Sequence, residues 1–417
     1  MMDRFKKKLS EKQMVIVHKY GGSSVSTTEK IMAIAKHLHA CHESGEELVV
    51  VVSAMGGTTN KLIALSNEIT DTPNKRELDV LLSTGELQSV ALLSIALHKL
   101  GERVVSLSGG QAGFLTSSDH THAYIEKIDV KRIKKHLSEG EIVVVAGFQG
   151  EDLLGDITTF GRGGSDTTAT ALASSLGCAC EIYTDVEAVH SVDPRIYENA
   201  KKLHEITYSD MMEMAVCGAK VLEPRSVELA CKYRVPLYLG KTLEVDKTKG
   251  TWIMENVDVE HMPIRSITQK DGYNAVVLTL SRYDTKYWSA VYKLCESLTN
   301  YEMLSSIISG EKAIFSFGVL DGALEEVKQK IQTELGESIG ALIRGGVVQI
   351  HSGLARISLV GIGLATHTKT AAIVSEILIE NQIEYGFVAN SEISLSFTVD
   401  EKDKQRAIEI LAKRFEL

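Results

Sequence analysis

Two short runs of aliphatic, mostly β-branched residues constrain the fold of this chain more than any other feature. The run "LVVVVSAM" covers residues 48–55 and the run "IVVVAGF" covers residues 142–148. Such runs, without polar alternation, are typical of strands that are buried on both faces, as in a parallel sheet covered by helices. Amphipathic segments such as residues 27–43 lie between strand-like runs. We therefore predict that residues 14–255 form an α/β domain with a largely parallel sheet between helices.

Length and composition narrow the class of protein. A chain of 417 residues is too long for one ordinary core, which favours two or three domains. The net charge of −10 argues against nucleic-acid binding, and no apolar run approaches the roughly 20 residues of a membrane span. Residues 1–13 are basic but have no apolar segment of a targeting signal, so we predict a solvated extension. Six irregularly spaced cysteines indicate reduced thiols in a cytoplasmic protein.

The C-terminal part has a different character and repeats itself. From about residue 270 the pattern runs twice through strand, helix, strand, strand and helix. The segments "IFSFGVLD" and "SLSFTVD" place Phe317 and Phe397 at matching positions. We predict two small α+β domains, at residues 270–345 and 346–417, that pack side by side.

A long apolar segment at residues 77–101 contains a lone acidic residue. We predict a helical region that is broken at Thr84–Gly85, with Glu86 directly after the break. A charge in apolar surroundings is costly unless it is paired. Glu86 therefore needs a cationic partner, which is either an arginine of the protein or the ammonium group of a ligand.

Glycine-containing turns follow the predicted strands, at the sheet edge where open α/β folds bind ligands. The first turn, "HKYGGSS", places Lys19 before Gly21, Gly22 and Ser23. A lysine beside such a turn suits phosphate oxygens, although a surface lysine beside a tight turn would look the same. The second turn, "SAMGGTTN", offers neutral hydrogen-bonding groups that could equally serve as helix caps.

The stretch "TTFGRGGSDTT" combines features of an anion site with an acidic residue. Glycines allow the backbone to approach a ligand, and the N terminus of a helix favours anions. Arg162 suits a carboxylate or a phosphate, whereas Asp166 adds negative charge to the same place. A metal ion, or control of the donors around a transferred group, would explain the aspartate. Together with Lys19, these residues predict phosphoryl transfer, in which a protein mostly positions reactants and neutralises charge.

Several motifs resemble, in order and spacing, those of aspartate kinases, which belong to the amino-acid kinase family. The motifs are "KYGGSSV", "VVVSAMGGTTN", "STGE", "GGQAGF", "VVAGFQG", "FGRGGSDTTA", "TDVEAVHSVDPR" and "CGAKVLEPRSVELA". The duplicated tail is similar to the paired ACT domains that bind regulatory amino acids in that family. The resemblance implies an amino-acid kinase fold at residues 14–255, followed by two ferredoxin-like ACT domains.

The resemblance also implies a reaction and a set of site residues. ATP and L-aspartate would give 4-phospho-L-aspartate and ADP with Mg²⁺, on the route to lysine, threonine and methionine. The implied catalytic residues are Lys19 and Asp166, and the implied aspartate-binding residues are Ser53, Thr59, Glu86 and Arg162. Arg162 would bind the α-carboxylate and Glu86 would face the α-ammonium group.

The nucleotide and its phosphates would be bound by a larger set. This set comprises Gly21, Gly22, Ser23, Gly163, Gly164, Ser165, Thr184, Asp185, His190, Arg195, Lys220 and Val221. A homo-oligomer joined through the ACT domains is implied, as is an amino-acid effector, namely lysine, threonine or diaminopimelate.

Some positions depart from the usual family pattern. His190 stands where an aromatic or apolar residue is common, and Glu223 stands where "KVLHP" is more usual. The helix starts in the tail lack the Pro-Gly that is usual in effector loops. Two alternatives stay open: a kinase for another amino-acid carboxylate, and a catalytically silent amino-acid sensor that keeps the fold.

Overall fold

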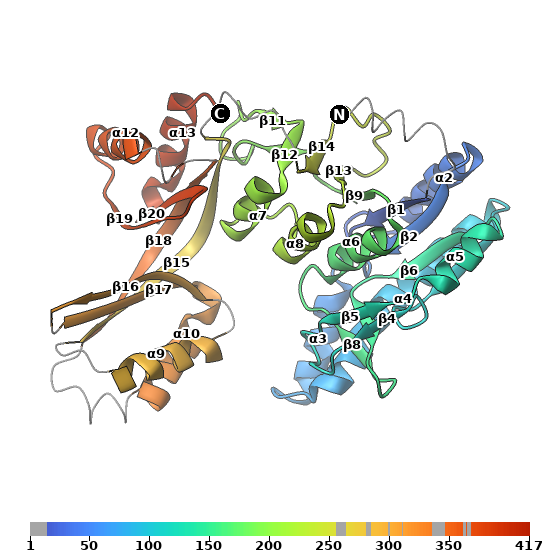
Figure 1. Ribbon diagram of the computed structural model, residues 1–417, viewed down its shortest axis with the longest axis horizontal. Helices are drawn as coiled ribbons and strands as arrows, with labels where there is room; N and C mark the ends of the chain where they lie inside the picture. Colours follow the sequence, from blue (N-terminus) through green and yellow to red (C-terminus); the bar gives the residue numbers. More distant parts are fainter. Residues whose placement is uncertain are drawn as a thin grey trace. The chain divides into compact units, whose positions relative to one another are not determined.

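The computed structural model describes residues 15–255, 264–280, 285–298, 301–310, 312–335, 347–361, 364 and 368–417 (Figure 1). The predicted N-terminal extension at residues 1–13 lies outside these residues, as do residues 281–284, 362–363 and 365–367 near the two helix starts of the tail that lack Pro-Gly. The chain divides into two compact units. The first contains residues 1–189, 202–215 and 220–258, and the second contains residues 190–201, 216–219 and 259–417.

The first unit is built around an eight-stranded sheet in the order β12-β14-β13-β9-β1-β2-β6-β3. Neighbouring strands from β13 to β3 are parallel to one another, as the uninterrupted aliphatic runs predict. The strands are β1 (Val15–Tyr20), β2 (Glu47–Val52), β3 (Val104–Leu107), β6 (Ile142–Ala146), β9 (Cys180–Thr184), β12 (Glu205–Thr207), β13 (Leu237–Lys241) and β14 (Thr251–Met254). A small second sheet, β5-β4-β7-β8, contains β4 (Phe114–Thr116), β5 (Ile125–Ile128), β7 (Gln149–Glu151) and β8 (Ile157–Thr159).

Helices of the first unit pack on the large sheet and on one another. They are α2 (Thr28–Glu43), α3 (Thr58–Ile69), α4 (Lys75–Lys99), α5 (Lys131–Ser138), α6 (Gly164–Leu176), α7 (Tyr208–Val216) and α8 (Pro224–Tyr233). Side chains of α2 and α4 share one buried cluster with Tyr20, Val50 and Val144 from β1, β2 and β6. Successive strand residues face opposite sides of a sheet, so Lys19 lies on the other face, where α6 packs against β1 (Figure 1).

Helix α4 corrects one sequence prediction. It is continuous from Lys75 to Lys99, and no break occurs at Thr84–Gly85. The glycine serves close packing, because a Cβ atom built on Gly85 would lie 2.9 Å from the Cβ atom of Ala54. Among the described residues α4 is also long and apolar enough to cross a membrane, but more than half of its most apolar stretch is buried inside the unit. That burial is typical of a core helix of a globular domain.

The second unit contains a six-stranded sheet in the order β16-β17-β15-β18-β20-β19. Its strands are β15 (Ser266–Leu280), β16 (Tyr301–Ser309), β17 (Lys312–Leu320), β18 (Val347–Val360), β19 (Tyr385–Asn390) and β20 (Ser394–Asp400). Its helical segments are α9 (Thr285–Ser297), α10 (Asp321–Lys330), η1 (Ile331–Leu335), α12 (Thr368–Glu380), η2 (Glu401–Asp403) and α13 (Lys404–Arg414). Two short strands, β10 (Val189–His190) and β11 (Lys202–Leu203), complete the elements.

The two halves of the repeat share this sheet. The long strands β15 and β18 pair with each other in antiparallel register along both halves. β15 then pairs with β17, and β18 pairs with β20, so each half adds a hairpin at its own edge. Phe317 and Phe397, matched in the sequence, are both buried. Each belongs to the hydrophobic cluster of its own half.

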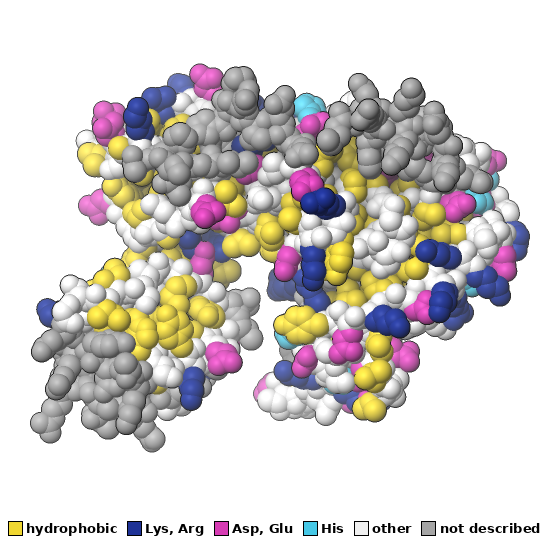
Figure 2. Space-filling model, viewed as in Figure 1, with side chains coloured by type: hydrophobic (Ala, Val, Ile, Leu, Met, Phe, Trp, Pro, Cys, Tyr) yellow, Lys and Arg dark blue, Asp and Glu magenta, His cyan; other side chains and the backbone are white. Residues whose placement is uncertain are grey.

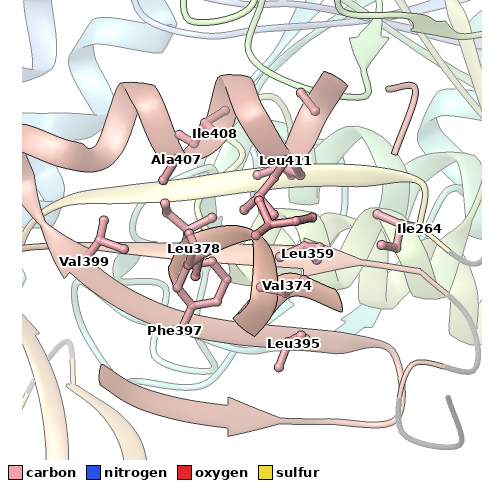
Figure 3. Close-up of a cluster of buried hydrophobic side chains, with 14 of the residues drawn as sticks. Ile264, Leu359, Val374, Leu378, Leu395, Phe397, Val399, Ala407, Ile408 and Leu411 are labelled. Carbon is pink, nitrogen blue, oxygen red and sulfur yellow. The ribbon is translucent and has the colours of Figure 1, made fainter. Parts of the chain in front are cut away.

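The cluster around Phe397 binds the segment at residues 190–201 into the second unit. Figure 3 shows side chains of α12 and α13, among them Leu378 and Leu411, packed with Phe397 of β20. Val192 is buried in the same cluster, and Ile196 packs against it. The segment that was predicted to line a nucleotide pocket is thus partly a packing element of the second unit.

Candidate active site

A pocket of about 300 Å³ lies where the loops after β1, β2, β6 and β8 meet the N terminus of α6. Backbone hydrogen bonds join these loops: Gly56 N–H donates to Gly22 O at 2.9 Å, and Gly147 N–H donates to Val52 O at 3.1 Å. The pocket is lined by Lys19, Gly22, Ser53, Ala54, Met55, Gly56, Gly57, Thr59, Asn60, Glu86, Phe148, Gly161, Arg162, Gly163, Gly164, Ser165 and Asp166. It lies at the carboxyl ends of parallel strands, as the sequence predicts.

Lys19 and Asp166 form an ion pair in this pocket. The Lys19 Nζ atom lies 2.5 Å from Asp166 Oδ1, and both side chains are nearly nine-tenths buried. β1 supplies the lysine, and Asp166 lies in the first turn of α6. The pair places an ammonium group beside the N terminus of a helix of 13 residues, whose dipole favours anions. This arrangement suits phosphate oxygens, with the carboxylate fixing the ammonium group.

Two glycines of the pocket lie where a side chain would collide with neighbouring groups. A Cβ atom on Gly22 would lie 2.8 Å from the carbonyl oxygen of Ala54. Gly163, the residue before α6, has a φ of +66°, and its Cβ atom would lie 2.2 Å from Glu223 Cγ. Gly22 therefore needs to be glycine because a side chain would collide with the backbone. Gly163 needs to be glycine because of both its positive φ and the nearby Glu223 side chain.

Glu86 brings a buried carboxyl group to the pocket. Its side chain is 3% exposed, and Ala54 N–H donates to Oε1 at 3.1 Å. The other oxygen, Oε2, is buried and has no hydrogen-bond partner among the described residues. Burial raises the pKa of Glu86 from its usual value near 4.5 to about 7, although the Ala54 N–H opposes the shift. No arginine pairs with Glu86 in the described part of the chain. Of the two cationic partners that the sequence suggests, an arginine or the ammonium group of a ligand, the ligand therefore remains.

Arg162 lies in the loop between β8 and α6 and is exposed. Within the described residues its guanidinium group makes no hydrogen bond or ion pair, so its donors are available to a ligand. Glu223 lies beside Gly163, and burial, followed by the nearby charge of Asp166, raises its pKa, while Arg162 lowers it. The acidic residue that departs from the family pattern is therefore close to the Arg-Gly-Gly-Ser-Asp loop.

The structure brings together ten of the residues predicted from the sequence. These are Lys19, Gly22, Ser53, Thr59, Glu86, Arg162, Gly163, Gly164, Ser165 and Asp166. The remaining predicted residues do not line this pocket: Gly21, Ser23, Thr184, Asp185, His190, Arg195, Lys220 and Val221.

Some of these residues lie next to the pocket along the sheet. Gly21 N–H donates to Tyr183 O at 3.2 Å, which places the turn after β1 beside the end of β9. Thr184 ends β9, and its hydroxyl donates to Asp185 Oδ1 at 2.9 Å. Ser23 directly follows Gly22, and Lys220 and Val221 lie between α7 and α8 of the first unit. His190 and Arg195 belong to the second unit, and Arg195 forms an exposed ion pair with Asp193.

Sequence reasoning missed Phe148 as part of the pocket. Phe148 has a φ of +70°, which is uncommon for a residue other than glycine, and its carbonyl oxygen accepts a hydrogen bond from Phe160 N–H at 3.0 Å. The aromatic ring packs close to Gly164, because a Cβ atom there would lie 2.8 Å from Phe148 Cδ2. The glycines on both sides of this residue in "AGFQG" were the available signal.

Fold and site together define a phosphotransferase of the amino acid kinase class with a C-terminal ACT region. The sequence model of the amino acid kinase family matches residues 14–241, and that of an ACT domain matches residues 357–415. The chain is 42% identical over 410 residues to an aspartokinase of Geobacillus stearothermophilus, with 97% of each chain covered. It is 38% identical over 413 residues to aspartokinase 2 of Bacillus subtilis, with 97% of this chain and 98% of that protein covered. The chain belongs to the aspartokinase family.

Solved structures agree on the fold. E. coli aspartokinase III in complex with aspartate and ADP superposes with a TM-score of 0.79 at 22% identity, covering 97% of this chain and 100% of that one. Clostridium acetobutylicum aspartate kinase has a TM-score of 0.73 at 20% identity, with coverage of 96% and 100%. These similarities confirm the predicted fold class, an amino-acid kinase fold followed by an ACT region.

Proposed function

We propose that this protein is an aspartate kinase that transfers the γ-phosphate of ATP to the β-carboxylate of L-aspartate. The observation that carries the assignment of the pocket is the placement of Glu86 and Lys19 in one cavity. Glu86 offers a buried, unshared oxygen to an ammonium group, and Lys19 offers an ammonium group to phosphate. A substrate that satisfies both ends is an amino acid that receives a phosphoryl group.

The transfer itself needs no general base. The β-carboxylate of aspartate is ionised at neutral pH and attacks the γ-phosphorus directly. A carboxylate oxygen–phosphorus bond forms while the bond to the bridging β,γ-oxygen breaks, so 4-phospho-L-aspartate and ADP are the products. Lys19 and the N terminus of α6 would hold the transferring group, and the Lys19–Asp166 pair would orient the ammonium group.

We assign the substrate contacts as follows. Arg162, whose guanidinium group has no partner among the described residues, would bind the α-carboxylate, and Glu86 would bind the α-ammonium group. Ser53 and Thr59 would donate or accept hydrogen bonds at the substrate. The glycine-rich turns would cradle the phosphates, and Thr184 and Asp185 would lie toward the nucleoside. The proposed nucleotide contacts of His190, Arg195, Lys220 and Val221 rest on the resemblance alone.

The pocket also fits Mg²⁺, the usual companion of ATP. Mg²⁺ prefers one or two carboxylates together with substrate phosphates, and Asp166 offers such a carboxylate at the phosphate end. Asp166 would hold the ion, which would neutralise phosphate charge.

Regulation and assembly are proposed for the second unit. An amino acid, namely lysine, threonine or diaminopimelate, would bind there and inhibit the kinase. The edge strand β16 exposes Tyr301, Met303, Ile307 and Ile308, and hydrophobic side chains gather over this part of the unit (Figure 2). An edge strand with exposed apolar residues is suited to pairing with another chain, so we propose a homo-oligomer. The six cysteines of the whole chain are free thiols, and we therefore propose a cytoplasmic location for the protein.

Replacing Arg162 tests the assignment of the substrate site. Loss of a charge-assisted contact of about 1.5–3 kcal/mol should raise the KM for aspartate roughly 10- to 100-fold in Arg162→Ala, with the KM for ATP nearly unchanged. Arg103→Ala is a matched control, because Arg103 is exposed and bonds to Glu139 and Glu141 away from the pocket. Equal changes in both KM values would reject the role of Arg162.

A further inference from the structure

Asp79 is a fully buried carboxylate outside the pocket, on the same helix as Glu86. Thr121 N–H donates to it at 3.1 and 3.0 Å, and Thr159 donates through its backbone N–H at 3.2 Å and its hydroxyl at 2.6 Å. His120 Nδ1 lies 2.9 Å from Oδ2. A buried carboxylate is costly unless donors satisfy it, and here they surround both oxygens. The carboxylate therefore ties α4 firmly to two other segments.

One of these segments leads directly to Arg162. Thr159 is the last residue of β8, and Arg162 follows three residues later. Phe160, which directly follows Thr159, donates its N–H to Phe148 O at 3.0 Å. At the other end of the loop, α6 begins at Gly164. The Arg162 side chain itself has no hydrogen bond or ion pair within the described part of the chain. Its position therefore depends on how the two ends of this short loop are anchored.

Helix geometry relates this anchor to the pocket. Asp79 and Glu86 are seven residues apart on the continuous helix α4. Two turns of an α-helix bring such residues to the same face, about 10 Å apart along the axis. One rigid helix thus carries the carboxylate that faces the substrate ammonium group and the carboxylate that holds the strand before Arg162.

We propose that Asp79 is a positioning residue that sets the distance between Arg162 and Glu86, and so selects substrates by the spacing of their carboxylate and ammonium groups. This inference rests on the proposed roles of those two residues in binding aspartate. It predicts that the substrate class is restricted to α-amino acids, whose two groups share one carbon atom. Asp79 would act only through the loop at residues 160–163.

Two substitutions test the link at each end. Asp79→Asn replaces acceptor capacity with an amide that cannot accept from all of these donors. Thr159→Val keeps the shape of the side chain but removes the 2.6 Å hydroxyl bond, whereas Thr159→Ser retains the hydroxyl group. We expect a 10- to 100-fold rise in the KM for aspartate for the first two, a KM for ATP within about twofold, and recovery in Thr159→Ser.

A matched control separates positioning from general stability. Asp152 is also buried and accepts bonds from Ser118 Oγ at 2.7 Å, Leu154 N–H at 2.9 Å and Asp156 N–H at 3.0 Å. It holds the neighbouring hairpin but does not bond to Thr159. Asp152→Asn should therefore lower the melting temperature without a selective change in the KM for aspartate.

A double-mutant cycle with Arg162→Ala tests whether Asp79 acts through Arg162. If Asp79 acts through Arg162, adding Asp79→Asn to Arg162→Ala should change the KM for aspartate less than twofold, because the group to be positioned is gone. Multiplicative effects, or equal rises in both KM values for Asp79→Asn and Thr159→Val, would overturn the inference. An unchanged KM for aspartate in Arg162→Ala alone would refute the carboxylate site itself, and with it the role of Asp79.

Discussion

Glu86→Gln removes an ionisable carboxyl group from the pocket. The burial of this carboxyl group determines how strongly aspartate binding should depend on pH. The pKa of Glu86 rises from near 4.5 to about 7 because the carboxyl group is buried, so ionising it in the ligand-free protein costs about 3 kcal/mol more than ionising an exposed glutamate. An ammonium group can pair only with the ionised form. Aspartate should therefore bind with full affinity above pH 7, and the affinity should fall about tenfold for each pH unit below it.

Equilibrium titration of aspartate in the presence of ADP, at pH 6, 7 and 8, measures this dependence. The Kd of the wild-type protein should be roughly tenfold higher at pH 6 than at pH 8. Glu86→Gln should bind about 10- to 100-fold more weakly at pH 8, because a charge-assisted contact is lost, and its Kd should be flat across the range. The variant also serves as a control, because any pH dependence that arises from titration of aspartate itself should appear in both proteins. A wild-type Kd that changes less than twofold, or a variant with the same slope, would refute the reasoning.

The same carboxyl group predicts an opposite effect on stability. A glutamate with a raised pKa in the folded state is favourable when protonated, so the free energy of unfolding should fall as the pH rises from about 4.5 to 7. At pH 8, ligand-free Glu86→Gln should consequently be more stable than the wild type, by up to about 3 kcal/mol, and the gain should shrink toward pH 5. Urea unfolding of both proteins at the two pH values checks the sign.

Three further predictions concern the phosphate end, the loop before α6 and the edge strand. Lys19→Ala should lower kcat by at least about 100-fold in a protein that stays folded but melts at a lower temperature, because Asp166 loses its partner in a buried ion pair; near-normal turnover would remove this lysine from the mechanism. Gly163→Ala should destabilise the protein by about 1–3 kcal/mol, because the added Cβ atom meets Glu223. Gly57→Ala is the control and should destabilise the protein less, since φ is also positive there but no atom lies within 4 Å of the added Cβ atom. Equal losses of stability in thermal unfolding would contradict this prediction. Ile307→Glu on β16 should reduce the mass measured by light scattering, and an unchanged mass would move the interface elsewhere.

Local patterns were sufficient for much of the fold and site. The aliphatic runs that became β2 and β6 are buried along almost their whole length, so their parallel neighbours could be predicted. Lys19, Glu86 and Arg162 were found because charged residues beside glycines or within apolar segments need a reason. The same signal was present at Asp79, which lies in the apolar context "ELDVLLS" only seven residues before Glu86.

Tertiary packing decided the rest. The break expected at Thr84–Gly85 was wrong, because contact with Ala54, distant in sequence, explains the glycine within a continuous helix. The sequence pattern places the start of the repeat at about residue 270, whereas strand β15 already begins at Ser266. The polar "QKDG" conceals the first part of β15, since register shifts there let one strand continue through a loop-like sequence. The glycines near Phe148 indicated a turn, but they did not indicate that Phe148 itself, a residue other than glycine, would adopt a positive φ.

Formation of aspartyl hydroxamate tests the proposed reaction most directly. The purified full-length protein is incubated with aspartate, ATP, Mg²⁺ and hydroxylamine, which traps the acyl phosphate, and ADP release is measured in parallel. We predict hydroxamate and ADP in equal amounts, and loss of both in Lys19→Ala. ADP release without hydroxamate, or turnover only with another amino-acid carboxylate, would contradict phosphorylation of aspartate. No turnover with any acceptor would favour a catalytically silent sensor.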